Sequence, residues 1–114
     1  MTETGSGENA RRWPRHRIDV RLKVLFTESG AAKSAFGRGN NLSHGGMGAY
    51  IPCAIPVGTN LIMEVSFPYS PLEMTVRAVV RSCEGFRYGL EFVQVAEQVR
   101  AAIEKNCAAA AGRA

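Results

Sequence analysis

The sequence has 114 residues, enough for one domain with its own hydrophobic core and no disulfide support. Hydrophobic residues make up 46% and charged residues 21%, which excludes a wholly disordered chain. The formal net charge is +4, and six of the fourteen basic residues lie within the first 23 positions, which indicates an anionic partner: a nucleotide, a nucleic acid or a lipid headgroup.

The cysteine pattern excludes two further classes of protein. Cys53, Cys83 and Cys107 are odd in number and lack C-x-x-C spacing, so neither a zinc site nor a disulfide framework is expected. Reduced thiols favour a cytoplasmic location. No apolar run is long enough to span a membrane, and the first residues lack the charged and apolar regions of an export signal.

The first half of the chain predicts a flexible leader and then two strands. Residues 1–10 are small and polar. From Ile18 to Thr27, apolar and polar residues alternate with a period of two, as in a half-buried strand. A turn at residues 28–32 leads to a weaker strand over residues 33–42.

The second half predicts more short strands and one helix. The expected strands cover residues 47–51, 61–67, 74–83 and 87–93, with tight connections at 57–59 and 84–86. Short strands at this spacing indicate a small antiparallel barrel or sandwich. Val95, Val99, Ala102 and Ile103 recur at helical spacing, which predicts a helix over residues 96–107, and residues 107–114 are expected to form a disordered tail.

An R-x-x-x-R spacing from Arg11 to Arg15 is the first candidate motif, and Arg12 lies within it. Guanidinium groups can donate paired hydrogen bonds to phosphate oxygens and stack on purine faces. A solvated basic leader remains an equal alternative for this segment alone. The same spacing recurs from Arg17 to Arg21, but Arg21 lies on the outer face of a predicted strand, so we prefer the first copy.

An N-x-S-x-x-G spacing is the second motif, made by Asn41, Ser43 and Gly46, with Gly45 beside them. Such a cluster is most often an ordinary turn. Asn41 could also read a base edge, since its amide both donates and accepts, and Ser43 adds a hydroxyl. A missing Cβ at Gly46 would let a flat ligand approach the backbone. The two motifs together suggest a receptor for an anionic guanine nucleotide.

In the order, spacing and β-rich setting of these motifs, residues 11–106 resemble the PilZ domain family, bacterial receptors for cyclic di-GMP. The resemblance implies a six-stranded antiparallel β-barrel with a C-terminal α-helix. It assigns Arg11 and Arg15 to the family's arginine motif, and Asn41, Ser43 and Gly46 to its second motif. The resemblance leaves open whether one or two ligand molecules bind.

The expected function is therefore binding without chemistry. The resemblance implies a cyclic di-GMP receptor that orders its N-terminal arginine loop on the ligand and signals to an unidentified protein partner, with no other cofactor. Two alternatives stay open: a degenerate domain that contacts proteins without a ligand, and a barrel that binds nucleic acid through its basic arm. An enzyme is not expected, since the sequence offers no nucleophile–base pair, paired carboxylates or metal ligands at useful spacing.

Overall fold

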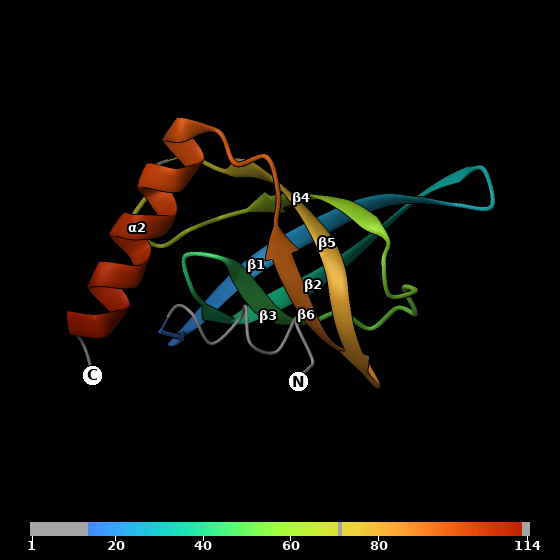
Figure 1. Cartoon of the computed structure of the whole chain (residues 1–114), viewed down its shortest axis with the longest axis horizontal. Coiled ribbons are helices and arrows are strands. Elements are labelled where there is room, and N and C mark those ends of the chain that lie inside the picture. The colour runs from blue at the N-terminus through green and yellow to red at the C-terminus, as the bar shows by residue number, and fades with distance from the viewer. Residues whose placement is uncertain (1–13, 71, 113–114) are drawn as a thin grey trace, which may run out of the picture.

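Six β-strands close into an antiparallel barrel, and one helix follows at the C-terminal end (Figure 1). The computed structural model describes residues 14–70 and 72–112. Around the barrel the strands are ordered β1-β2-β3-β6-β5-β4. The elements are β1 (His16–Glu28), β2 (Ala31–Leu42), β3 (Gly46–Tyr50), β4 (Asn60–Val65), β5 (Met74–Glu84), β6 (Arg87–Phe92) and α2 (Glu97–Gly112). The predicted fold class is confirmed.

Alternating side chains along the strands fill the barrel. In β1 the buried residues are Ile18, Val20, Leu22, Val24 and Phe26, the face that the sequence pattern predicted. Because successive residues of a strand point to opposite sides, the residues between them face outward. The outer face of the barrel is therefore free to carry polar groups.

The β1–β2 hairpin is longer than the barrel requires. Its turn has a positive φ at both central residues, 52° at Ser29 and 80° at Gly30. This is the turn geometry that matches the twist of two antiparallel strands. Figure 1 shows the hairpin extending away from the barrel at this end. The first part of β2 thus has β1 on one side and, within the described residues, no strand on the other.

Helix α2 packs against β1 and β5 and is longer than expected. The predicted disordered tail from residue 107 is wrong as far as residue 112, because the helix continues to Gly112. Alanine has the highest helix propensity, and Cys107 and Ala110 are buried, which favours the extra turns. Within the described part of the chain, no helix is both long and apolar enough to cross a membrane.

The buried hydroxyl of Tyr88 fixes the loop that follows β3. It donates a hydrogen bond to the Cys53 carbonyl at 2.6 Å and accepts one from the Ile55 amide at 2.9 Å. Burial raises the pKa of Tyr88. Tyr88→Phe should lower the free energy of unfolding by about 1–3 kcal/mol, because the buried Ile55 amide loses its acceptor. Thermal unfolding by circular dichroism measures this, with Tyr50→Phe as the exposed control. Equal melting temperatures for the two variants would contradict the assigned role.

Candidate functional site

A row of small residues crosses the outer face of the barrel. Strand register places Asn41 of β2 opposite Gly48 of β3, Gly48 opposite Gly89 of β6, and Gly89 opposite Ser82 of β5. Cross-strand partners of this kind project from the same face of the sheet. Two of the four have no side chain, and the short side chains of Asn41 and Ser82 lie where a Cβ on Gly48 or Gly89 would stand, so the surface is low and flat here. We call this row the glycine floor.

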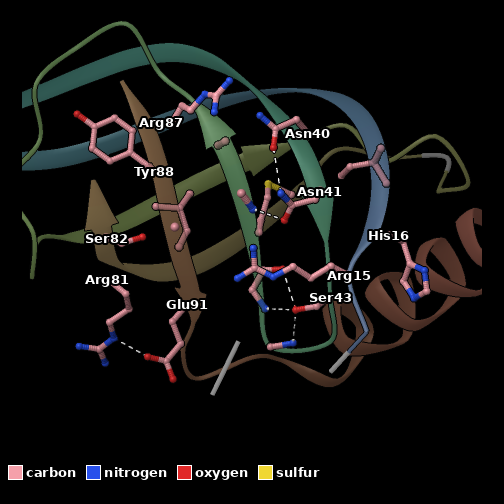
Figure 2. Close-up of a pocket in the computed structure, with 18 of the residues that line it drawn as sticks. Arg15, His16, Asn40, Asn41, Ser43, Arg81, Ser82, Arg87, Tyr88 and Glu91 are labelled. Carbon is pink, nitrogen blue, oxygen red and sulfur yellow. Dashed lines mark hydrogen bonds and ion pairs between the residues drawn. The ribbon is translucent and has the colours of Figure 1, made fainter. Parts of the chain in front are cut away.

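The Asn41 side chain lies against the floor. Its Oδ1 accepts a hydrogen bond from the Gly48 amide at 3.0 Å, and its Nδ2 donates one to Asn40 Oδ1 at 3.2 Å (Figure 2). A Cβ on Gly48 would come within 2.4 Å of Asn41 Nδ2, so glycine here leaves room for the Asn41 amide in this position. An amide has two donor hydrogens and two acceptor lone pairs. Asn41 is therefore held in place with one donor and one acceptor still to offer a ligand.

Ser43 shapes the turn between β2 and β3. Its hydroxyl oxygen accepts hydrogen bonds from the amides of Gly45 at 3.2 Å and Gly46 at 3.1 Å, and lies 3.4 Å from the Gly46 carbonyl. The side chain is buried, and the Ser43 amide also bonds to the Gly46 carbonyl. We expected this hydroxyl to hydrogen-bond a base edge. In the structure it is used within the turn, and it holds the backbone that borders the floor.

Gly46 lets two strands approach closely. A Cβ there would stand 2.2 Å from the Leu90 carbonyl oxygen of β6, nearer than any real contact allows. Gly45 adds a second link to the same strand, since its carbonyl accepts from the Phe92 amide at 3.0 Å. We expected Gly46 to keep the surface flat for a ligand, and its clearest role in the structure is to allow β3 to pair with β6.

A groove of about 1470 Å³ lies over the floor, and Arg15, Asn41, Ser43, Gly45 and Gly46 all line it (Figure 2). Arg15 comes from the segment just before β1, and its side chain is exposed. The structure thus brings one arginine of the first motif to the same groove as the whole second motif. Arg11 and Arg12 lie outside the described residues.

Strands β5 and β6 supply groove residues that the sequence analysis missed. Arg81, Ser82, Arg87, Gly89 and Glu91 also line the groove. Arg81 Nε donates to Glu91 Oε1 at 2.5 Å across the two strands. The hairpin of β5 and β6 was predicted, but its place beside β3 was not, because pairing between distant strands leaves no mark in local sequence. Gly89 could have indicated this face from the sequence. A single glycine within a strand pattern often marks a place where a ligand or another backbone comes close to the strand.

The groove has an excess of unpaired positive charge. At its edge Arg38 Nε donates to Asp19 Oδ1 at 2.8 Å, and this hydrogen bond, with the charge of Arg38, lowers the pKa of Asp19. Arg81 is paired with Glu91. Three other groove arginines, Arg15, Arg17 and Arg87, form no ion pair among residues 14–70 and 72–112. Exposed guanidinium groups around a flat floor suit a planar anion.

The described residues hold no group of three or more His, Cys, Asp or Glu side chains that could bind a metal ion. The carboxylates of the groove are those of Asp19, Glu84 and Glu91. Asp19 and Glu91 are each bonded to an arginine, and Glu84 forms no ion pair within the described residues. The exposed arginines of this face suit recognition of an anion.

Comparison with known proteins identifies the class of barrel. The family model of the PilZ domain matches residues 9–109, and the chain belongs to the PilZ domain family. This family includes receptors for cyclic di-GMP, and its domains are generally ligand-binding and non-enzymatic. The resemblance suggested by the two motifs is therefore confirmed.

Two solved structures share the fold. The PilZ domain of YcgR from Escherichia coli, solved with cyclic di-GMP, has a TM-score of 0.67 and 18% identity, over 90% of this chain and 92% of that one. The PilZ domain of CeSA from a cellulose-synthesizing bacterium has a TM-score of 0.62 and 14% identity, over 88% and 97%. No curated protein sequence matches the chain. Because the identities are only 18% and 14%, these two structures support the fold and nothing more specific.

Proposed function

We propose that this chain is a receptor for cyclic di-GMP that binds the dinucleotide on the glycine floor. One observation carries the proposal: Arg15 and the whole Asn41–Gly46 motif border a single groove with a flat, cation-rich surface. Membership of the PilZ family supports it, as does the YcgR domain, whose structure contains cyclic di-GMP. The family supports this class of ligand, and the groove supports this position for the site.

The proposed binding mode divides the ligand between two kinds of group. Guanidinium groups of Arg15, and of Arg11 and Arg12 outside the described residues, would donate to phosphate oxygens and lie on guanine faces. Asn41 would use its remaining donor and acceptor on a guanine edge. A guanine ring would lie over the low surface at Gly48 and Gly89, beside the Asn41 amide and the Ser82 hydroxyl. No bond of the ligand is made or broken.

We propose that ligand binding changes the surface of the protein next to the start of β1. Because the arginine motif immediately precedes β1, ligand binding should fix residues 11–15 against the barrel and present a new face near this end of the chain. A protein partner would respond to that face. The three thiols are unpaired in the structure, which fits a reducing compartment such as the cytoplasm.

Calorimetric titration with cyclic di-GMP, with GTP as control, tests the proposal. We expect saturable binding of cyclic di-GMP and at least tenfold weaker binding of GTP. A chain that binds neither nucleotide would be a degenerate domain. A chain that binds single-stranded oligonucleotides with steep dependence on salt, and does not bind cyclic di-GMP, would be the nucleic-acid-binding barrel.

Filling the floor should block the ligand without unfolding the protein. In Gly89→Val the new Cβ would meet only the Ser82 hydroxyl, at 2.4 Å, and this small side chain can rotate away. The valine methyls would then stand where we place the guanine ring. We expect at least tenfold weaker binding of cyclic di-GMP with a near-normal melting temperature. Thr75→Val, on the exposed side of β5 outside the groove, is the control. Unchanged affinity in Gly89→Val would place the ligand elsewhere.

A further inference from the structure

Three aromatic side chains are exposed together beyond one end of the ligand groove. Phe36 of β2 is 72% exposed, Tyr50 of β3 48% and Phe86 of the β5–β6 turn 44%. Tyr50 and Phe86 meet edge to face, with ring centroids 6.3 Å apart. We call these three residues the aromatic patch. Clustered exposed rings cost hydration free energy, which indicates a surface that another molecule covers.

A small apolar groove runs through the patch. It has a volume of about 360 Å³ and is lined by Phe36, Tyr50 and Pro52 together with Arg21 and Arg38. This volume accommodates one or two side chains of a partner. The groove over the glycine floor, which we call the ligand groove, has about four times that volume, 1470 Å³. The two grooves share no lining residue.

The charges that line the small groove are positive, while Glu64 lies opposite Lys23 in the strand register and Glu84 comes two residues before Phe86. Lys23 Nζ lies 5.6 Å from the centroid of the Phe36 ring, and strand register places Arg21 opposite Arg38 and Arg38 opposite Tyr50. Arg38 is neutralised by Asp19, but Arg21 and Lys23 form no ion pair within the described part of the chain. No acidic residue lines the small groove itself. An occupant with carboxylates would complement this surface.

An open strand edge lies directly beside the patch. Strand β3 pairs with β2 only from Arg38 onward, while β1 pairs with β2 over its whole length. Residues 31–36 therefore have backbone groups on one edge with no strand partner among the described residues. Ala31, Ala32 and Ser34 have small exposed side chains that leave this edge accessible. An edge of this kind can add one further strand.

We propose that a segment of a partner protein docks here as an extended strand, carrying acidic residues around one large apolar side chain. Its backbone would pair with residues 31–36 of β2, its apolar side chain would enter the groove between Phe36 and Tyr50, and its carboxylates would face Arg21 and Lys23. This surface deepens the proposed function by giving the chemical class of the partner. It stands independently of cyclic di-GMP, because the ligand groove is lined by other residues.

Two other occupants fit less well. A single strand of nucleic acid stacks its bases on open ring faces. Here Lys23 lies over the Phe36 ring, and Phe86 meets Tyr50 at an interplanar angle of 85°, so the rings form no parallel platform. A second copy of this chain would bring a second set of uncompensated cations to the same surface. An acidic protein strand would pair with the free edge of β2, fill the small apolar groove and face Arg21 and Lys23, so it fits all three features.

The test uses the ligand-free chain and a displayed library of random peptides of about eight residues, a typical strand length. We expect enrichment of peptides with Asp or Glu on both sides of an aromatic or large aliphatic residue. The best peptide, made synthetically, should bind at least tenfold more weakly to Phe36→Ser and to Arg21→Glu. It should bind normally to Ile62→Ser, which changes an exposed apolar residue on β4. Backbone N-methylation of the peptide should abolish binding.

Four results would contradict the proposal or assign the aromatic patch to another occupant. Absence of an enriched acidic motif would overturn the proposal, and so would a peptide that binds Phe36→Ser as well as the unaltered chain. Loss of self-association in Phe36→Ser would assign the patch to a second copy. Competition by single-stranded oligonucleotide with equal or higher affinity would assign it to nucleic acid. Phe36 is largely exposed, so these variants should fold, and their binding of cyclic di-GMP tests the ligand groove separately.

Discussion

Replacing Arg15 with alanine is expected to weaken binding of cyclic di-GMP at least tenfold and to leave the melting temperature of the free chain unchanged. Arg15 is exposed, lines the groove and forms no ion pair within the described residues, so its side chain adds little to folding. A charge-assisted hydrogen bond contributes about 1.5–3 kcal/mol. Each 1.4 kcal/mol or so is a factor of about ten in the dissociation constant, so two such bonds predict a larger loss than one.

Two comparisons separate a specific contact from a general effect of charge. Arg100→Ala removes an exposed arginine from α2, outside the groove, and should bind cyclic di-GMP normally. Arg15→Lys keeps the charge but lacks the planar, forked donor, so we expect an affinity between those of the unaltered chain and Arg15→Ala. Calorimetric titration of all four proteins at one ionic strength measures the effect. Equal losses in Arg15→Ala and Arg100→Ala would show that only net charge matters.

The second large effect concerns stability. Gly46→Ala is expected to lower the free energy of unfolding by about 3 kcal/mol or more, since a Cβ would lie 2.2 Å from the Leu90 carbonyl oxygen. That atom belongs to the β6 backbone, so it cannot rotate away, and the β3–β6 pairing must open instead. For a domain of this size the loss corresponds to a fall of roughly 10 °C or more in melting temperature.

The matched control for this substitution is Gly112→Ala. Gly112 is the last residue of α2, and a Cβ there would meet nothing within 4 Å. The melting temperature should therefore change little. Urea unfolding of both variants measures the difference in free energy. A Gly46→Ala protein as stable as the unaltered chain would show that β3 and β6 do not approach as closely as described.

Much of the fold was predictable because most strands have one buried and one exposed face. The alternation of Ile18, Val20, Leu22 and Val24 predicts the inward face of β1, and these four residues are buried. The tight connection at residues 84–86 predicts the β5–β6 hairpin. The helix end was less predictable, because the alanine-rich segment after Cys107 has no strong apolar pattern. Its burial depends on contacts that the barrel provides.

The candidate site was only partly predictable. The second motif was found by spacing, yet the hydroxyl of Ser43 serves the turn and Gly46 serves strand packing. Polar and small residues suit both ligand contact and tight turns. Residue type alone therefore could not separate a ligand-binding role from a structural one. Gly89 and Arg87 come from β6, which reaches the groove only because it pairs with β3. Register between strands so distant in sequence is set by the closed barrel as a whole.

The barrel has two separate grooves, which we propose as the ligand site and the partner site. The ligand groove lies over Gly48 and Gly89, and the aromatic patch lies beside the free edge of β2. The Arg38–Asp19 pair stands between them, since Asp19 lines the first and Arg38 the second. A receptor with this arrangement would hold its ligand and its partner next to each other without overlap.

The most direct test of where the ligand binds is a titration of the isotope-labelled chain with cyclic di-GMP, followed by amide chemical shifts. We predict that the amides of Gly46, Gly48 and Gly89 shift progressively and saturate, while those on the exposed side of α2 do not move. These three amides lie in or beside the glycine floor, so a ligand that binds there should change their surroundings. Shifts confined to α2 or to the tip of the β1–β2 hairpin, with these three glycines unmoved at saturation, would contradict the proposed site.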